Sequence, residues 1–484
     1  MLVDQHGNPL NSKPKVEPRR IRARYDAASG DADNANHWAM ADSLSAVRAN
    51  SESVRRRLRE RSRYEVANNS YARGALDTLA AYTVGQGPTL QLNFRGVALT
   101  PDDEREMRSV AQQVELLYSY WSYSRCIADK LRTVCLATNQ DGESFALFTT
   151  SAKPSSDTPV ELDVRLYEAD QFADQGLGTW QRDDSGVQLG LDGEPTAYSV
   201  LEQHPGDYST ANNRARWLPA EMVLHCFRRE RPGQLRGIPR TTPALPLFAQ
   251  LRRYILATIT AAETAADFAA IMYQDGYSDT DEATTPWDRV PIERGAMLTV
   301  PGGSRIAQLK AEHPTATFDE FVRAILREIA RAIGLPAVLM LGDASSYNYS
   351  SGRLDLQSFQ RMMATDRSQI LERQFLDRIF EAWLAESLLI PGFLPEAFAA
   401  TASDWDFGWR WEMPEHVDRE KEANGQQTEL ANMTTTLSRE YSRRGQDWEV
   451  ELRQRARELA LISELGLTPA QAQPQQPKPE PQAN

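Results

Sequence analysis

Residues 317–334 read TFDEFVRAILREIARAIG, and residues 342–352 read GDASSYNYSSG. In the first segment the apolar residues recur at helical spacing, at Phe318, Phe321, Val322, Ile325, Ile329 and Ile333. Thr317 and Glu320 have the spacing of a capping box, while Gly334 and Pro336 form a stop. The sequence therefore predicts a helix over 317–333, followed by a polar, glycine-bounded loop that carries no recognisable catalytic group.

A second, longer helical pattern follows this loop. Its apolar positions are Phe359, Met362, Met363, Ile370, Leu376, Ile379, Phe380, Trp383 and Leu384. At 1.5 Å per residue, the helix would be roughly 50 Å long. Such a length is unusual in a compact monomer, so the pattern indicates an assembly or a kinked, shared element.

The composition predicts a folded protein that does not cross a membrane. A chain of 484 residues with 41% hydrophobic content allows about three domains with real cores. No apolar run reaches the roughly 20 residues that a membrane span needs, and 1–17 lacks the apolar core of a secretory signal. We expect synthesis in the cytoplasm. The three cysteines, Cys126, Cys135 and Cys226, match no zinc or redox spacing, and we expect buried, inert thiols.

The net charge is −13, which argues against a protein that grips nucleic acid tightly, because phosphate neutralisation needs clustered Lys and Arg. The charge is unevenly distributed. Residues 1–63 carry thirteen basic and eight acidic side chains, a net +5, which leaves −18 for the remainder. This basic arm could contact a neighbour or phosphates, or could be a solvated tail.

Periodicity divides the rest of the chain. Helical patterns cover 43–82, 102–139, 243–273 and 416–465. Short strands are expected at 145–149, 164–167, 187–191, 198–201 and 222–227, so 43–239 reads as one mixed domain. A hairpin is expected where 297–300 and 305–309 flank Pro301-Gly302-Gly303. The Trp-rich stretch 391–414 reads as irregular, and the Pro- and Gln-rich end 468–484 reads as disordered.

The alanine-rich helix over 243–273 carries an acidic pair. Glu263 and Asp267 lie at i and i+4, where like charges repel, so both should face water. An exposed helix face is one interpretation. In a ring, the same face could line a central hole.

The search for chemistry finds no catalytic or metal-binding pattern and no cofactor motif. There is no Walker A loop, G-x-S-x-G elbow, H-E-x-x-H or C-x-x-C, so a motor ATPase is not expected. His225 and Cys226 are adjacent in a strand and point to opposite faces, which favours structural roles. Asp404 and Asp406 read as loop carboxylates. We predict that the protein is not an enzyme.

Two basic groupings remain. Arg323, Arg327 and Arg331 form a stripe whose charge is partly neutralised by acidic residues on the same helix. This pattern favours a solvated or intersubunit face. The second grouping surrounds Pro232-Gly233 and consists of Arg228, Arg229, Arg231, Arg236 and Arg240. A DNA-contacting role for this group stays open.

Several segments resemble one family. Residues 228–239, RRERPGQLRGIP, are similar to the R-P-G-Q-x-R-G-x-P segment of lambda-type tailed-phage portal proteins. Residues 348–353, NYSSGR, resemble the family's N-Y-S-S-x-R, although Gly352 stands where the family more often has alanine. Residues 68–75 and 84–87 match its N-terminal region. The segments occur in the family's order, so the resemblance covers about 25–465.

The resemblance implies a predominantly helical α+β fold of wing, stem, clip and crown that closes into a ring, usually of twelve subunits. It divides the chain into an N-terminal arm (1–39), a mixed α/β wing (40–240), a first stem helix (243–273), a clip (274–316), a second stem helix (317–333), a tunnel-loop region (334–353), a long helix with a return into the wing (354–415), a C-terminal helical crown region (416–467) and a disordered tail (468–484).

The resemblance also implies a function, a conduit at a capsid vertex through which double-stranded DNA is packaged and ejected. The implied partners are further copies of the chain, DNA bound without sequence specificity, the terminase large subunit, major capsid and scaffold proteins, and head-completion or neck proteins, with no membrane. The expected tunnel-loop residues are Asp343, Ser345, Ser346, Tyr347, Asn348, Tyr349, Ser350 and Ser351. Glu263 and Asp267 are expected to line the channel, and Asp279, Asp281 and Glu282 to meet the motor.

Two alternatives stay open. One is an enzyme that acts on DNA or polysaccharide through unrecognised carboxylates. The other is a neck or tail component without DNA contact, which leaves the polar loop without a task.

Overall fold

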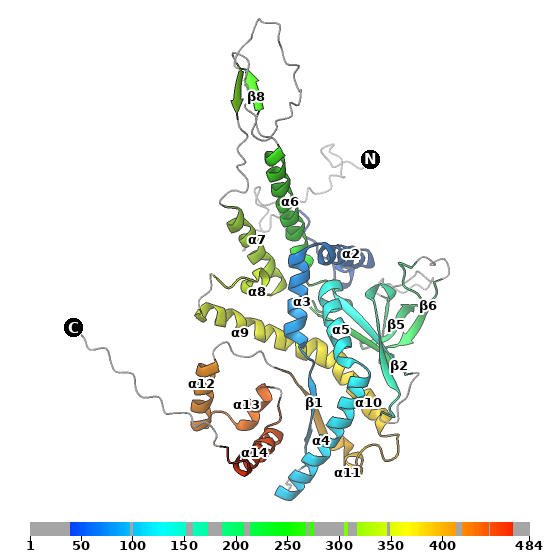
Figure 1. Cartoon of the computed structure of the whole chain (residues 1–484). Helices are drawn as coiled ribbons and strands as arrows, with labels where there is room; N and C mark the ends of the chain where they lie inside the picture. The colour runs from blue at the N-terminus through cyan, green and yellow to red at the C-terminus, as the bar shows by residue number, and fades with distance from the viewer. Residues whose placement is uncertain are drawn as a thin grey trace, which may run out of the picture.

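The computed structural model describes residues 39–96, 100–151, 158–172, 186–207, 213–267, 271–274, 304–307, 317–345, 349–412, 419–444 and 446–467. The predicted arm, apart from its last residue, and the predicted tail lie outside these residues. The described part is an elongated body from which α6 (Leu245–Asp267) and the pair β8 (Ile271–Gln274) and β9 (Ser304–Ala307) project (Figure 1). None of the described helices has an apolar run sufficient to span a bilayer.

The N-terminal helices are α1 (Ala46–Ala49), α2 (Glu52–Asn68), α3 (Ser70–Val84), α4 (Pro101–Ser124) and α5 (Ile127–Asp141). The predicted patterns over 43–82 and 102–139 are therefore not continuous. Asn69 has extended backbone angles, and its side chain accepts the N–H of Tyr71 at 3.1 Å, which caps α3. Cys126 separates α4 from α5 with a left-handed φ of 52°. Gly85 ends α3, as predicted.

Two small antiparallel sheets follow. In the first, β2 (Glu143–Thr150) lies between β3 (Leu162–Tyr167) and β7 (Val223–Phe227). In the second, β5 (Pro195–Leu201) lies between β4 (Val187–Leu189) and β6 (Ala215–Pro219). The strands predicted between 145 and 227 are confirmed, and β6 is an addition. Short 3-10 turns join the elements at η2 (Ala169–Gln171), η4 (Ala220–Met222), η5 (Thr242–Ala244) and η7 (Ala402–Asp404).

A third strand pair joins distant parts of the chain. β1 (Thr89–Phe94) pairs antiparallel with β10 (Trp405–Arg410). The prediction that 391–414 is irregular is wrong, because this stretch contains α11 (Glu396–Ala400) as well as β10. Residues with alternating aromatic and polar character, as in β10, form a stable strand only when a partner supplies the hydrogen bonds. That partner lies far away in sequence.

The predicted helix over 317–333 is confirmed as α7 (Phe318–Ile333), and Gly334 ends it with a φ of 85°. The capping box is wrong: the Thr317 side chain makes no capping hydrogen bond, and its backbone is already helical. A short helix, α8 (Ala337–Leu341), lies between α7 and the polar loop. Pro336 stands immediately before it, at a position where a missing backbone N–H costs nothing.

The long second helix is also confirmed. Helix runs from Tyr349 to Ser387 as α9 (Tyr349–Asp366), a π-helical stretch η6 (Arg367–Leu376) and α10 (Asp377–Ser387). The wider π turns coincide with contacts to other elements. Arg367 donates to the carbonyls of Thr83 at 2.7 Å and Tyr82 at 3.1 Å, the last carbonyls of α3. The long helix thus crosses and joins the body (Figure 1).

The described chain has two large hydrophobic cores. The first lies among α4, α5, α10 and the β1–β10 pair and includes an aromatic cluster around Tyr118, whose ring centroid lies 5.2 Å from Trp383 and 5.4 Å from Phe380. The second joins α3, α6, α7, α8 and α9 through residues such as Leu76, Phe248, Ile329 and Phe359. A smaller core fills the space between the two sheets.

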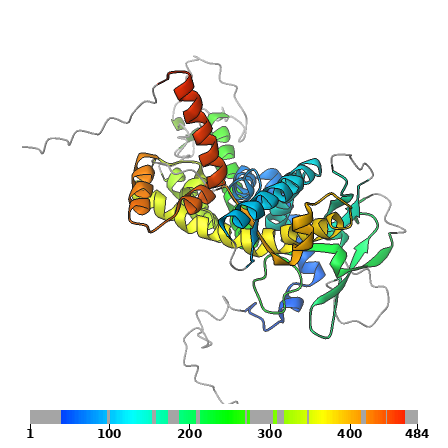
Figure 2. The same ribbon diagram turned by 90° about the horizontal axis from the view of Figure 1, so that it is seen from below.

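The C-terminal helices α12 (Arg419–Ala431), α13 (Leu437–Arg443) and α14 (Trp448–Glu464) confirm the pattern predicted over 416–465. They lie beside the long helix, and the β4–β5–β6 sheet lies at its other end (Figure 2). No residue of α14 is buried. A 17-residue helix is marginal without tertiary packing, so α14 lacks most of the stabilisation that helices receive in a folded core.

The predicted hairpin is confirmed only in part. The strand expected at 305–309 is present as β9, and its described partner is β8, paired Tyr273 to Arg305. Residues 297–300, the expected partner, lie outside the described residues.

We predict that Trp383→Ala destabilises the fold by about 3–5 kcal/mol, because the fully buried indole fills the first core and its removal leaves a cavity. Trp217→Ala is the matched control, because Trp217 is 51% exposed on β6 and its loss should cost less than about 1 kcal/mol. Urea unfolding followed by fluorescence measures both. Equal losses would contradict this description of the core.

Candidate functional site

The projecting end of the molecule is formed by α6 and α7. Leu251 of α6 is buried, none of residues 252–263 is, and Leu256 and Ile259 are about half exposed, at 53% and 49%. The two helices meet through aromatic rings: Tyr254 lies 5.5 Å from Phe318 and 4.8 Å from Phe321. Glu263 is exposed near the end of α6, as expected. Asp267 closes the same helix, but its side chain lies outside the described residues.

The polar loop begins on a fixed base. Arg323 of α7 pairs with Asp343 at 3.1 Å and with Asp319 at 2.7 Å. The other carboxylate oxygen of Asp343 accepts the N–H of Ser345 at 2.9 Å. Hydrogen bonds from Ser345, supported by Arg323, lower the pKa of Asp343. The loop therefore leaves α8 with its first turn already formed and fixed to α7 through Arg323.

The remaining predicted loop residues divide into two groups. Residues 346–348 lie outside the described part of the chain. Tyr349, Ser350 and Ser351 form the first turn of α9, so the expectation that they are loop residues is wrong. The predicted motor-contact residues Asp279, Asp281 and Glu282 also lie outside the described residues.

The basic cluster does not form one surface. Arg236 is fully buried, and Arg240 donates to the carbonyl of Ile333 and pairs with Asp366 at 2.8 Å. Arg228 pairs with the same Asp366. These three guanidinium groups are used inside the fold, so the suggestion that the whole cluster contacts DNA is wrong. Arg229 and Arg231 alone remain exposed.

The carboxylate of Glu143 is the centre of a buried polar network. Arg236 donates to both of its oxygens, at 2.8 and 2.6 Å, and the N–H of Gly237 donates at 3.0 Å. Arg59 of α2 lies 3.6 Å away. Burial alone would raise the pKa of Glu143, but the charge of Arg236 and the hydrogen bonds from His225 and Arg236 hold it well below its usual range. Sequence reasoning missed this network because nothing local marks Glu143.

His225 completes the network as a neutral side chain. Its Nε2 lies 3.1 Å from Glu143, and its ring stacks on Phe145 with centroids 4.1 Å apart. Burial lowers the pKa of His225 to about 4, although the Glu143 carboxylate partly opposes this. At neutral pH the imidazole therefore donates from Nε2 and leaves Nδ1 for the hydroxyl of Tyr198 at 3.4 Å. The predicted structural role for His225 fits this geometry.

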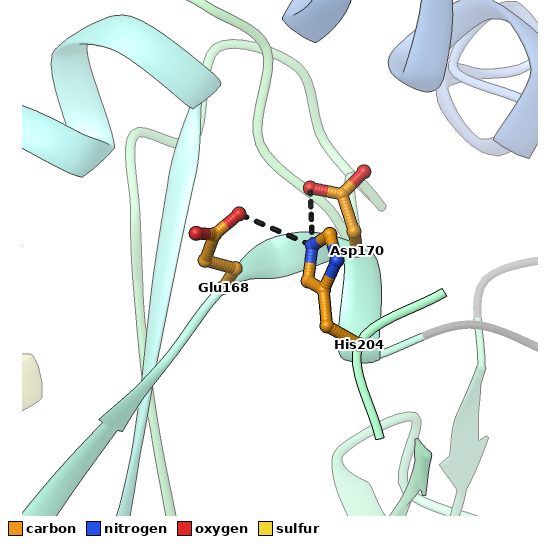
Figure 3. A group of neighbouring side chains, drawn as sticks. All are labelled: Glu168, Asp170 and His204. Carbon is orange, nitrogen blue, oxygen red and sulfur yellow. Dashed lines mark ion pairs between the residues drawn. The ribbon is translucent and has the colours of Figure 1, made fainter. Parts of the chain in front are cut away.

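A second group, Glu168, Asp170 and His204, could in principle hold a metal ion, since its ligand atoms lie within 4.8 Å of one another (Figure 3). Arg63 reaches into the group, however, 2.7 Å from Asp170 and 3.1 Å from Glu168. Arg59 is a further 3.2 Å from Asp170. A guanidinium in this position repels a metal cation and neutralises the carboxylates, so the geometry fits an ion-pair cluster better than a metal centre.

Two of the three cysteines are inert. Burial raises the pKa of Cys135 and of Cys226 to about 12, so both thiols are protonated and unreactive. Cys126 is exposed, so the prediction that it is buried is wrong. Asp406 pairs with Arg95, which leaves no paired acid and base with Asp404.

The comparisons with known proteins decide the family. Residues 33–367 match the phage portal protein, lambda family. This chain belongs to that family. The match runs from before α1 to the end of α9 and contains the R-P-G-Q segment and the polar loop.

One curated relative of this family member is the probable portal protein of Halomonas phage phiHAP-1, 26% identical over 325 residues. The match covers 63% of this chain, and the chain spans 61% of the relative's length. Among solved structures, the portal family chain is similar to a chain of the virion of the native gene transfer agent particle, with 14% identity and a TM-score of 0.41 over 85% of this chain and 93% of that one. A chain of the neck of the empty gene transfer agent particle is 15% identical, with a TM-score of 0.42 over 84% of this chain and 93% of that one.

We predict that His225 makes the fold acid-sensitive. An unfolded histidine binds a proton near pH 6.5, whereas buried His225 does so only near pH 4, so stability falls as pH drops through this window. Between pH 7 and pH 5 the wild type should lose about 2 kcal/mol more than His225→Gln, which keeps a donor for Glu143 but cannot titrate. Urea unfolding at the two pH values measures the difference. Identical pH dependence would show that the fold does not lower the pKa of His225.

Proposed function

We propose that this chain is a portal subunit: copies close into a ring, usually of twelve, through which double-stranded DNA is packaged and ejected. The family match over 33–367 carries this proposal. The described structure supports it with a projecting helix pair and with a polar loop held at its base by Arg323.

On this proposal the named regions follow the elements. The wing is 40–240, the stem helices are α6 and α7 within 243–273 and 317–333, the clip is 274–316, the tunnel loop lies within 334–353, the long helix and wing return are 354–415, and the crown region is 416–467. The half-exposed Leu256, Ile259 and Phe321 of the stem would pack against neighbouring subunits. The unburied α14 would also gain its packing there.

The proposed conduit is passive, with an external ATPase supplying the work. Twelve copies of a chain of net charge −13 make a particle of very roughly −150. With a Debye length of about 8 Å, a wall carboxylate such as Glu263 repels the duplex only at close range. A wall that made many phosphate contacts would resist sliding. The proposed channel-lining residues are therefore the acids Glu263 and Asp267, with the loop from Asp343 to residue 348 and the first turn of α9 touching DNA.

The proposed partners are the terminase large subunit and neck proteins at the clip, and capsid and scaffold proteins around the ring. The proposed location is the portal vertex of a virion, after synthesis in the host bacterium. The clip candidates Asp279, Asp281 and Glu282 would face the motor.

The mass of the purified assembly tests the ring. A closed ring with a central hole in negative-stain images, at a mass of several copies, is the expected result, because the stem and α14 expose apolar surface that a single copy leaves uncovered. A monodisperse monomer at micromolar concentration, or an open filament, would sink the proposal.

The loop gives a separate prediction. Replacing 345–350 with a flexible Gly-Ser segment of equal length should leave ring assembly unchanged, because the stem contacts remain, and should strongly reduce the number of DNA-filled heads. The matched control is the same type of replacement at 191–193, an exposed turn between β4 and β5. Normal filling in the loop variant would remove the loop from the mechanism.

A further inference from the structure

A cavity of about 720 Å³ lies between β7 and the long helix. Its walls come from the β4–β5 turn, β7, the R-P-G-Q turn and the face of the long helix that carries Arg373, Gln374 and Arg378. The volume is in the range of about 300–1,000 Å³ typical of binding pockets. Neither the conduit nor the tunnel loop uses it.

Arginines without acidic partners line this cavity. Arg229, Arg231, Arg373 and Arg378 stand at its walls, and none of them forms an ion pair with a carboxylate among the described residues. Their described contacts are weaker: Arg231 donates to the carbonyl of Leu44, Arg378 to the carbonyl of Glu221, and Arg229 lies over the ring of Phe227. Glu194 and Glu230 are the acids in the lining, so the cavity is net positive inside a chain of charge −13.

The R-P-G-Q turn places two of these arginines, Arg229 and Arg231, on the exposed side of the chain. Gly233 takes a left-handed φ of 73° at the turn. The buried Gln234 then ties the turn together, because its Oε1 accepts the N–H groups of Glu230 and Arg231 and its Nε2 donates to the carbonyls of Arg228 and Arg236. Arg236 points inward to Glu143, whereas Arg229 and Arg231 point away from the core. The rim is thus preorganised for an anion.

The floor of the cavity is a strand edge. β7 is an outer strand of its sheet. The side-chain amide of Gln374 makes the hydrogen bonds that a neighbouring strand would make: it accepts the N–H of Phe227 at 2.9 Å and donates to the carbonyl of Phe227 at 3.2 Å. Backbone groups alternate in direction along a strand, so His225 turns its N–H and C=O to the same side as Phe227. Val223 turns its carbonyl to this side too, while its N–H is bonded to the carbonyl of Ala220. Both residues line the cavity. An extended segment can therefore add to this edge beyond Gln374.

We propose that this cavity binds an extended, Asp- or Glu-rich segment of a partner protein. The backbone of the segment pairs with β7, and its carboxylates meet Arg229, Arg231, Arg373 and Arg378. A peptide fits both features, since it supplies a strand and acidic side chains. A duplex offers phosphates on a broad convex surface and has no strand to add, so the edge of β7 favours a polypeptide. None of the residues proposed for the channel or the tunnel loop lines this site.

Fluorescence anisotropy tests the site, with the full-length protein and a labelled ten-residue peptide that alternates Glu and Val. We expect saturable binding that weakens as salt rises, because charged pairs carry it. Arg229→Ala combined with Arg373→Ala should weaken binding about tenfold or more, through the loss of two charge-assisted contacts. Arg361→Ala is the matched control, because Arg361 is exposed on α9, outside the cavity, and should change nothing.

Hydrogen exchange supplies an independent measurement. The peptide should slow exchange of the backbone amides of β7, whereas a charge contact alone would leave them unchanged. No binding at millimolar peptide, equal binding to the double variant, or equal competition by a 20-base-pair duplex would overturn the proposal. Loss of self-assembly in the double variant would also overturn it, because the cavity would then belong to an interface between copies.

Discussion

The buried ion pair between Glu143 and Arg236 holds together the part of the fold that contains the two three-stranded sheets. Two charges in a dry interior are stable only when each is fully satisfied, and here the carboxylate receives Arg236, the N–H of Gly237 and the imidazole of His225. Arg236 also donates to the carbonyl of Phe172 at 2.7 Å. The pair therefore joins β2, β7, the turn after β7 and the end of η2 at one point. Removing either charge would strand the other in the core.

The turn that contains Arg236 also connects to the helices. Gln234 stabilises this turn, and the chain continues to Arg240, which donates to the carbonyl of Ile333 and pairs with Asp366. Ile333 ends α7 of the projecting pair, and Asp366 ends α9. One short segment of sequence thus joins the β3–β2–β7 sheet to α7 and to the long helix.

The long helix serves as the common support of the body. Its π-helical stretch places Arg367 against the last carbonyls of α3 and Gln374 against the edge of β7. By contrast, residues 252–263 of α6 and the whole of α14 contain no buried side chain within one copy. Exposed apolar side chains thus remain on α6 and α14, whereas the buried charges lie between the sheets and the helices that cover them.

The sequence by itself determined the helices α7 and α9 to α10, the stop at Gly334 and most strands between 145 and 227, because hydrophobic periodicity and turn residues act over a few positions. The sequence did not show that the aromatic run of β10 forms a strand or that Asn69 interrupts a helix. It also did not show that the Thr317 side chain makes no capping hydrogen bond. Tertiary structure alone decided that Arg236 is buried while Arg229 and Arg231 are exposed, and that Glu168, Asp170 and His204 meet Arg63. The local sequence around a charged residue does not show its ion-pair partner, because the packing of distant segments decides which charges meet.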